Sequence, residues 1–283
     1  MMIQKSCISW YGGKGANTQR KLLEKILEDI NTNEKKIFVD VFGGSGIISI
    51  NVRNKIIKYN DINRNLYNFF KVIQDDVKGP IFKNKIEKSL YSEEEYKKYS
   101  EEVRNKEIGS EDIPDVESAI KFYIALMQSV ARIGIFKKSG FKQSKSTIRR
   151  GMSQVVSAWK SNIDEELDKV IDKFRSIEVY NDDFRKCIKR FDSSDTIFYL
   201  DPPYIKSTRK SKEVYGNELT DDDHKELVEI LLKIKGQAIL SGYDNEIYKK
   251  LEENGWEKIK FTINSIQSGN QREENIWSNL RKV

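Results

Sequence analysis

Short apolar runs alternate with amphipathic stretches over most of the chain. Runs at 37–42, 56–59, 177–180 and 196–200 are rich in Ile, Val, Phe and Tyr and end at Gly, Asn, Asp or Pro. Runs of this length and composition are typical of buried parallel strands. The stretches between them repeat apolar residues at helical spacing, which predicts helices at about 17–30, 63–77 and 163–174. The pattern therefore predicts an α/β fold, with a mostly parallel sheet covered by helices on both faces.

The last part of the chain continues this alternation. Thr220 and Asp223, three positions apart, resemble a capping box that begins a helix reaching about residue 234. The remaining predicted elements are a strand at 237–241, a helix at 246–253 and two strands near 256–263 and 275–280.

The middle of the chain has a different character. From 81 to 132 it forms long polar helical stretches rich in Glu, Lys and Tyr, without a strand pattern. Together with the segment up to about residue 160, this region is predicted to be a mainly helical insertion into the sheet domain. The predicted boundaries are 1–78 for the first part of the sheet domain, 79–160 for the insertion and 161–283 for the second part.

Positive charge is concentrated in one segment. The chain carries a net charge of +6, but residues 118–163 contain no Asp or Glu. This segment holds nine basic residues: Lys121, Arg132, Lys137, Lys138, Lys142, Lys145, Arg149, Arg150 and Lys160. Such segregation favours a polyanion as the partner, because binding it releases condensed counterions. A solvated basic face without a partner is the alternative.

Composition excludes several kinds of chemistry. The two cysteines and the single histidine, His224, provide neither a disulfide framework nor a zinc cage, and they argue against a Ser-His-Asp triad. His224 follows three aspartates, which a helix dipole explains better than a metal site does. No apolar run approaches the roughly 18–20 residues of a membrane helix, and the first eleven residues lack a secretory pattern. We therefore expect a cytoplasmic protein with no membrane contact and no metal.

Two features follow predicted strands where ligands of α/β sheets bind. The glycine-rich turn Phe42-Gly43-Gly44-Ser45-Gly46 lets the backbone approach a ligand closely, although many such turns are only tight turns. Asp61 ends the next strand, where a carboxylate can accept hydrogen bonds from ribose hydroxyls. A helix-capping aspartate is the alternative interpretation of Asp61.

The most specific feature is Asp201-Pro202-Pro203-Tyr204, directly after an apolar run. The prolines fix the backbone and remove two N–H donors, which leaves the Pro202 carbonyl as an acceptor. A carboxylate and an aromatic ring stand beside it. This set suits a primary amine on a nucleobase, whereas a rigid turn explains only the prolines.

With these motifs the chain resembles the Dam-like, D12-class adenine-N6 DNA methyltransferases. The resemblance covers both ends and most of the length. Its motifs here are Trp10-Tyr11-Gly12-Gly13-Lys14, Phe42-Gly43-Gly44-Ser45-Gly46, Asn60-Asp61-Ile62-Asn63, Asn181-Asp182-Asp183-Phe184, Asp201-Pro202-Pro203-Tyr204 and Glu273-Glu274-Asn275-Ile276-Trp277-Ser278-Asn279.

The resemblance implies a Rossmann-like class I methyltransferase sheet, with the insertion as a DNA-recognition domain. It implies S-adenosyl-L-methionine as the methyl donor and double-stranded DNA as the partner, with no obligatory protein partner. Trp10 and Lys14 would close over the methionine end of the donor, Asp61 would hold its ribose, and Asp183 and Phe184 would border its adenine. The implied donor-binding residues are Trp10, Lys14, Asp40, Phe42, Gly43, Asp61, Asp183, Phe184 and Asp201.

The implied catalytic residues are Asp201, Pro202 and Tyr204. Asp201 and the Pro202 carbonyl would accept the two N–H bonds of the adenine N6 and expose its lone pair. Tyr204 would stack on the adenine after the base has left the helix, because the atom is unreachable inside a duplex. The methyl group of a sulfonium is already activated, so no metal is expected.

The basic segment is the predicted DNA-binding region. Its predicted contacts are Arg132, Lys137, Lys138, Lys142, Lys145, Arg149 and Arg150. No loop that reads a particular target sequence can be matched in it, so the target site stays open. A second basic stretch, residues 206–212, follows the Asp-Pro-Pro-Tyr motif and is either a loop that orders on DNA or an ordinary solvated loop.

Two further functions share this motif architecture. Cytosine-N4 methylation of DNA and amide methylation of protein glutamine use a related motif with a different first residue. A DNA-binding protein without activity that keeps the fold is another class. Asp201, the basic insertion and the Trp10–Lys14 motif favour adenine in DNA over the other two methylations, and the intact Asp-Pro-Pro-Tyr motif argues against a protein without activity.

Overall fold

The computed structural model describes residues 3–105, 113–203, 219–264 and 271–280. The chain divides into two compact units. Unit 1 comprises Met1–Ile3, Lys14–Ile62 and Tyr180–Val283, and unit 2 comprises Gln4–Gly13 and Asn63–Val179.

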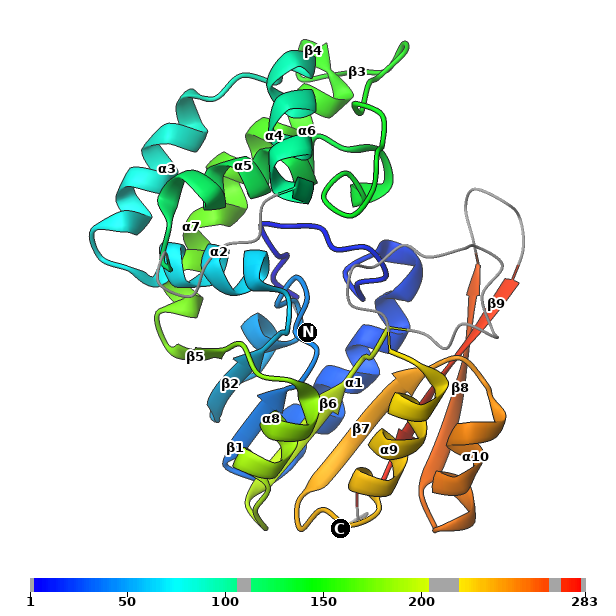
Figure 1. The fold of residues 1–283 in the computed structure, drawn as a ribbon. Coiled ribbons are helices and arrows are strands. Elements are labelled where there is room, and N and C mark those ends of the chain that lie inside the picture. The colour runs from blue at the N-terminus through cyan, green and yellow to red at the C-terminus, as the bar shows by residue number, and fades with distance from the viewer. Residues whose placement is uncertain (1–2, 106–112, 204–218, 265–270, 281–283) are drawn as a thin grey trace. The chain divides into compact units, whose positions relative to one another are not determined.

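A seven-stranded sheet with the order β5-β2-β1-β6-β7-β9-β8 organises the fold (Figure 1). Strands β1, β2, β6 and β7 pair in parallel, whereas β9 runs antiparallel to both of its neighbours. Chain order reverses at β1, since β2 lies on one side and β6 on the other. The strands are β1 (Ile37–Asp40), β2 (Ile56–Asn60), β5 (Ile177–Tyr180), β6 (Thr196–Leu200), β7 (Gln237–Gly242), β8 (Glu257–Asn264) and β9 (Gln271–Ser278).

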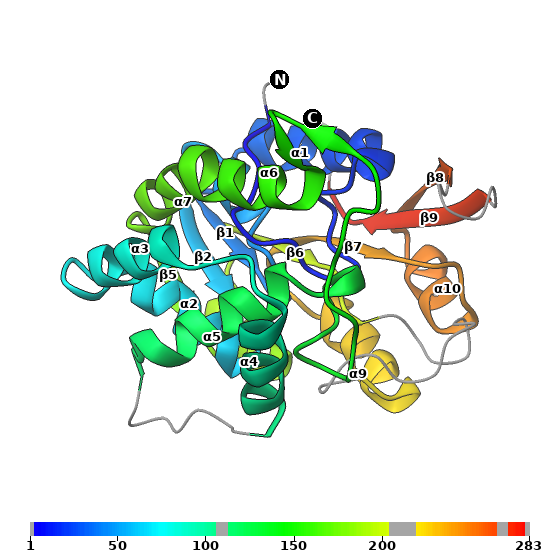
Figure 2. The same ribbon diagram turned by 90° about the horizontal axis from the view of Figure 1, so that it is seen from above.

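Helices cover both faces of the sheet in unit 1. Helix α1 (Arg20–Thr32) lies on one face, and α8 (Phe184–Phe191), α9 (Asp221–Leu231) and α10 (Glu246–Glu253) lie on the other, as the two views of Figures 1 and 2 show. All five residues of β6 are buried, because a strand covered on both faces has no polar side. The predicted α/β class with a Rossmann-like, mostly parallel sheet is confirmed.

Side-chain caps fix where the helices of unit 1 begin. Thr220 and Asp223 form the predicted capping box at the start of α9. Asp183 caps α8 and Asn245 caps α10 through side-chain oxygens that accept backbone N–H groups. The caps Asp183 and Asn245 follow β5 and β7 within three residues, so that α8 and α10 begin close to the carboxyl edge of the sheet.

Unit 2 is mainly helical and has an aromatic core. Phe70 stacks on Phe174 with ring centroids 3.9 Å apart, and Phe69 stacks on Tyr123 at 5.9 Å. The helices are α2 (Arg64–Gln74), α3 (Lys78–Lys88), α4 (Glu93–Asn105), α5 (Val116–Met127), α6 (Gln154–Ser161) and α7 (Leu167–Phe174), with a π-helical turn at Asn162–Glu166 between the last two.

A small hairpin lies within the basic segment of unit 2. Strands β3 (Ile148–Arg149) and β4 (Met152–Ser153) pair antiparallel across a two-residue turn. Arg150 and Gly151 both have positive φ, at 54° and 73°, which is the backbone of a type I′ turn. None of the helices in the described ranges has the length and apolar character that crossing a bilayer requires.

Candidate active site

The glycine-rich turn after β1 is packed against a buried ring. The Tyr59 hydroxyl donates to the Gly44 carbonyl oxygen at 2.8 Å. A Cβ at Gly43 would stand 2.2 Å from Cε2 of that ring, so no other residue fits without moving the ring. Gly44 and Gly46 have φ values of 50° and 70°, a region that favours glycine. The turn is therefore held in one conformation at the carboxyl end of β1.

Hydrogen bonds join the carboxyl ends of neighbouring strands in unit 1. The Asp61 carboxylate accepts from the Gly44 N–H at 2.9 Å. The Asn60 amide donates to the carbonyl oxygens of Val41 and Asp182, at 2.9 and 3.0 Å, and accepts from the Asp182 N–H at 2.8 Å. The predicted ribose-binding carboxylate thus lies beside the glycine-rich turn.

Asp40, the last residue of β1, is a buried carboxylate. It is 1% exposed, and its Oδ2 accepts from the Ser49 hydroxyl at 2.7 Å. Burial raises the pKa of Asp40 to about 7, the Ser49 hydrogen bond opposes this shift, and the charges of Asp201 and Asp61 add to it. Asp40 is therefore a group that readily loses its proton when a cation binds nearby.

Asp201, directly after β6, belongs to a chain of buried polar groups. Lys14 Nζ donates to Asp201 Oδ1 at 2.6 Å and lies 3.1 Å from Glu274 Oε1 on β9. The side chains of Lys14 and Glu274 are each 1% exposed, and that of Asp201 is 17% exposed. Burial raises the pKa of Asp201 to about 6, with Lys14 lowering it and Glu274 raising it.

These groups leave an excess of negative charge at one edge of the unit 1 sheet. The charges of Asp201 and Asp61 act on Asp40, and that of Glu274 acts on Asp201. Lys14 is a cation that interacts with Asp201 and Glu274. Carboxylates in excess of cations attract a positively charged ligand.

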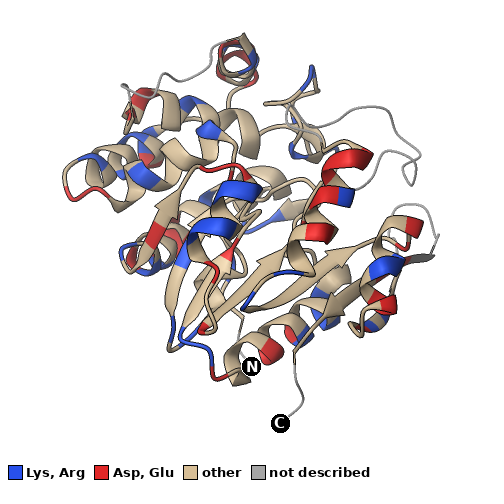
Figure 3. Ribbon diagram, turned by 60° about the horizontal axis from the view of Figure 1, so that its bottom comes forward, with Lys and Arg blue, Asp and Glu red and all other residues tan. Residues whose placement is uncertain are grey.

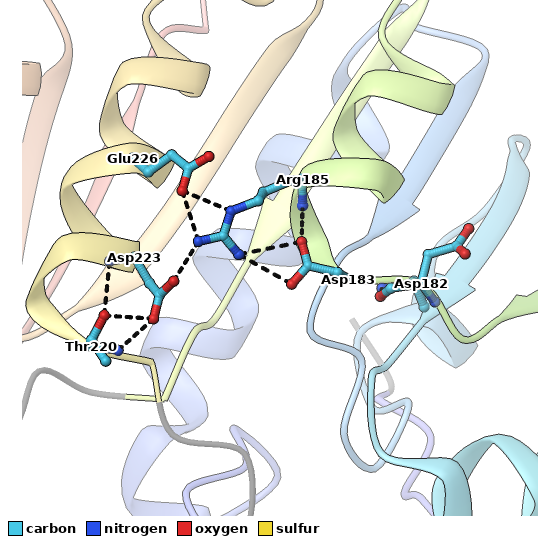
Figure 4. Close-up of polar contacts among 7 residues, drawn as sticks. Asp182, Asp183, Arg185, Thr220, Asp223 and Glu226 are labelled. Carbon is cyan, nitrogen blue, oxygen red and sulfur yellow. Dashed lines mark hydrogen bonds and ion pairs between the residues drawn. The ribbon is translucent and has the colours of Figure 1, made fainter.

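Asp183 lies in a network at the starts of α8 and α9 (Figure 4). Its carboxylate accepts from the Arg185 N–H at 2.9 Å, and the Arg185 guanidinium lies 3.2 Å from it. The guanidinium also pairs with Glu226 at 2.7 Å and with Asp223, the capping residue of α9. Asp183 is therefore oriented by Arg185.

Phe184 and Phe42 lie together in unit 1. Their ring centroids are 5.9 Å apart. Phe184 is buried in the core cluster, whereas Phe42 is only partly buried. The Arg185 guanidinium covers the Phe184 ring at 4.3 Å from its centroid.

The remaining predicted site residues fall in different places. Pro202 is buried in unit 1. Trp10 belongs to unit 2, where its ring meets Phe136 edge-on at 5.2 Å and lies 6.4 Å from Phe122. Tyr204 and the basic stretch 206–212 lie outside the described residues.

His224 has a structural environment. Its side chain is buried, and its Nδ1 makes a 2.8 Å hydrogen bond with the Tyr248 hydroxyl. Within the described ranges, no group of three or more His, Cys, Asp or Glu side chains is arranged to hold a metal ion. The neighbouring aspartates begin α9, and Asp223 completes its capping box.

The predicted DNA-binding residues differ in exposure. Lys137, Lys138, Lys145 and Arg149 are exposed. Arg150 is exposed too, but it pairs with Glu165 at 2.9 Å.

Arg132 and Lys142 are half-buried in unit 2. Arg132 donates to the Met127 carbonyl oxygen, and burial lowers its pKa. Burial, followed by the charge of Arg132, lowers the pKa of Lys142. Elsewhere in the described chain both charge signs are mixed along the helices (Figure 3).

A family model described as "D12 class N6 adenine-specific DNA methyltransferase" matches residues 10–268. No curated protein matches the sequence. Among solved structures, a crystal structure of precorrin-6y C5,15-methyltransferase from Geobacter metallireducens GS-15 is similar with a TM-score of 0.40 and 9% identity, covering 99% of this chain and 100% of that chain. A likeness at that score carries no argument about this protein.

Proposed function

The chain belongs to the D12 class N6 adenine-specific DNA methyltransferase family, and from that premise we propose that unit 1 binds S-adenosyl-L-methionine and presents Asp201 and Pro202 to the adenine N6. The match spans nearly the whole chain, so adenine-specific DNA methylation is its activity. Because the matching family is adenine-specific, it argues against cytosine-N4 methylation and protein-glutamine methylation, which share the motif architecture.

The charge of the site supports this methyl donor. S-adenosyl-L-methionine, when bound, supplies an activated methyl group on a positively charged sulfonium. The excess of carboxylates over cations at this edge attracts such a cation, and burial, which raises the pKa values of Asp40 and Asp201, makes an additional positive charge favourable for their ionised forms. Gly43, which has no room for a side chain on the Tyr59 side, lets the backbone of the turn come close to the ligand.

Specific donor contacts are proposed for the residues around this edge. The Asp61 carboxylate, oriented by the Gly44 N–H, accepts from the ribose. Phe42 and Phe184 provide an apolar surface, and Asp183 borders the adenine of the donor. Asp40 faces its amino group. Trp10 and Lys14 serve the methionine end.

Catalysis is proposed to rest on orientation and electrostatic preorganisation. Asp201 accepts one N–H of the adenine amine and the Pro202 carbonyl accepts the other, so that the N6 lone pair points away from the ring. As the sulfur–carbon bond of the donor breaks, the amine nitrogen would form the new bond to the methyl carbon and would pass one proton to Asp201, which already accepts that N–H, and the donor would leave as a neutral thioether. Tyr204, outside the described residues, is proposed to stack on the extruded base.

DNA contacts are proposed for the exposed part of the basic segment. Lys137, Lys138, Lys145, Arg149 and Arg150 reach solvent and suit phosphates. Arg132 and Lys142 are half-buried, so we propose that they add to the positive field and support the segment from inside.

The observation that carries the proposal is a partly buried carboxylate, Asp201, at the carboxyl end of β6 with Pro202 directly after it. Mass spectrometry of nucleosides after incubation with DNA and methyl donor tests it. We expect N6-methyladenine from the unmodified protein. We expect none from Asp201→Ala, with DNA binding kept. N4-methylcytosine as the product contradicts the proposal, and no transfer to any DNA favours a DNA-binding protein without activity.

A further inference from the structure

Glu274 is a buried carboxylate in unit 1 with no role in the proposed function. It lies on β9, which pairs with β7 and β8, and its side chain is 1% exposed. Both of its oxygens are engaged: Oε1 lies 3.1 Å from Lys14 Nζ, and Oε2 accepts from the Gln19 amide at 3.1 Å. The groups form a continuous chain from Gln19 through Glu274 and Lys14 to Asp201.

This arrangement is costly for stability alone. Lys14 already has a partner in Asp201 at 2.6 Å, so Glu274 shares this cation with another carboxylate and adds a desolvation penalty of its own. Buried ion pairs are often no more stable than apolar residues of the same size. An extra buried charge next to a reacting group is better explained by an effect on that group.

We propose that Glu274 is a positioning residue for methyl transfer, which shares the charge of Lys14 so that Lys14 fixes one oxygen of Asp201 without weakening the other as an acceptor. The inference rests on the proposed role of Asp201. Lys14 orients the carboxylate, and Glu274, held by Gln19, keeps Lys14 in place. The second oxygen of Asp201 then accepts the N–H of the adenine amine.

The electrostatics of Asp201 agree with this role. Burial comes first in raising its pKa, Lys14 lowers it, and Glu274 raises it again. Among the residues that the structure describes, Asp40, Tyr199 and Tyr248 also interact electrostatically with Asp201. Without Glu274 the full charge of Lys14 acts on Asp201, which becomes a weaker acceptor with a lower pKa.

The test compares Glu274→Gln with Glu273→Gln, which makes the same change at an exposed neighbour on β9. For Glu274→Gln we expect kcat to fall on the order of 10- to 100-fold, as for a displaced reacting group. We expect the KM for DNA to stay within about threefold, because Glu274 is buried in unit 1 and makes no proposed DNA contact. The acid limb of the pH–rate profile should move to lower pH. Glu273→Gln should change none of these.

A second measurement does not depend on activity. In protein carrying ¹³C-labelled Asp carboxyls, without donor and DNA, the Asp201 signal is assigned by its loss in Asp201→Asn. Its titration midpoint should fall in Glu274→Gln and stay unchanged in Glu273→Gln. Glu274→Asp, which keeps the charge but shortens the side chain, should keep the midpoint and lose kcat.

The outcomes separate the two proposals. No activity in the unmodified protein contradicts the proposed function, while the titration still reports on Glu274. An unmoved Asp201 midpoint in folded Glu274→Gln, or a loss of kcat equal to that of the control, overturns the role of Glu274 and leaves the proposed function standing. If Glu274→Gln fails to fold, the Asp201 titration midpoint is measured in Glu274→Asp instead. The inference expects an unchanged midpoint in that variant, and a changed midpoint overturns it.

Discussion

At the scale of single residues, the buried Asp40 makes stability depend on pH. Its ordinary pKa of 3.8 is raised to about 7 in the fold, so the folded state holds a proton that the unfolded state loses. The fold accommodates the protonated Asp40 side chain at low pH. The stability that comes from its raised pKa is lost as pH rises through about 7. A pKa difference of this size corresponds to on the order of 4 kcal/mol.

We therefore expect Asp40→Asn to stabilise the ligand-free protein increasingly as pH rises. The gain in unfolding free energy, measured with urea, should be near zero at about pH 4 and level off above about pH 8. The Asn oxygen can still accept from the Ser49 hydroxyl. Asp76→Asn, at a side chain that is 91% exposed, should show no such trend. A gain that is the same at every pH would contradict the explanation.

The positions of candidate site residues were predicted best where they follow strands directly. Asp61 and Asp201 were expected at the carboxyl ends of strands, and they directly follow β2 and β6, whereas Asp40, expected inside the run 37–42, is the last residue of β1. The ion pair between Lys14 and Asp201 could not be predicted, because the residues are 187 positions apart. Glu274 was seen only as part of a motif. One available signal was its position two residues before Ile276, because alternate residues of a strand share a face and Glu274 therefore lies on the same face as an apolar side chain.

At the scale of elements, the starts of α8 and α9 are held together by Arg185 (Figure 4). The pKa of Asp223 is lowered to about 2, first by its hydrogen bonds with Thr220 and then by Arg185. A lowered carboxyl pKa contributes stability above the ordinary value of 3.8, and that stability is lost as pH falls toward about 2.

Asp223→Asn should therefore lower the unfolding free energy by about 1–2 kcal/mol. The loss should be constant above about pH 5 and shrink below about pH 4. Asp222→Asn is the matched control, because it removes a charge from the same helix start at a side chain that is 88% exposed. Chemical denaturation across this range measures both. Equal losses in the two variants would assign the effect to the helix dipole alone.

The hairpin of β3 and β4 presents Arg149 and Arg150 on an exposed turn. Reversing both charges, Arg149→Glu with Arg150→Glu, should weaken DNA binding on the order of 10- to 100-fold at low salt. The slope of log affinity against log salt should become shallower by about 0.9 for each phosphate that the variant no longer neutralises. Fluorescence anisotropy measures both quantities.

Two exposed lysines outside the basic segment allow a control with the same net charge. Lys36 and Lys249 have side chains that are 79% and 51% exposed, in unit 1. Lys36→Glu with Lys249→Glu should leave the salt slope nearly unchanged. If the hairpin variant and this control behave alike, the hairpin makes no specific phosphate contacts.

Element bounds were predicted best where strong breakers flank a run. The strands at 177–180 and 196–200 and the helix at 246–253 agree with the structure to the residue. The expected helix at 63–77 ends at Gln74, because Asp75 accepts the N–H groups that begin α3. The expected helix near 163–174 contains the π-helical turn Asn162–Glu166, whose backbone bonds leave no periodic sign in the sequence.

At the scale of the molecule, local patterns predicted the parallel sheet but not its order. Strands β8 and β9 were expected last, yet β9 lies between β7 and β8 and runs antiparallel to both. That position sets the side chain of Glu274 beside Lys14. Likewise, the chain passes from unit 2 to unit 1 between Gly13 and Lys14. Both features depend on contacts between distant residues, which no local pattern records.

The basic segment and the carboxylates near Lys14 belong to different units. The basic segment lies in unit 2, and the carboxylates around Lys14 lie in unit 1. A buried negative site acts on a cation through short-range interactions, whereas exposed basic side chains act on DNA through a field that salt screens. The two ligands should therefore respond to different solution conditions.

Affinity for S-adenosyl-L-methionine should rise on the order of tenfold from about pH 5 to about pH 7, because a bound cation favours ionised Asp40 and Asp201, whose pKa values are about 7 and 6. Binding in this range should release protons, which calorimetry in buffers of different ionisation enthalpy detects. S-adenosyl-L-homocysteine lacks the sulfonium charge and should show a weaker rise. Raising salt from about 50 to about 200 mM should weaken DNA binding far more than donor binding. If S-adenosyl-L-methionine and S-adenosyl-L-homocysteine show the same pH dependence of affinity, the carboxylates of unit 1 do not face the sulfonium.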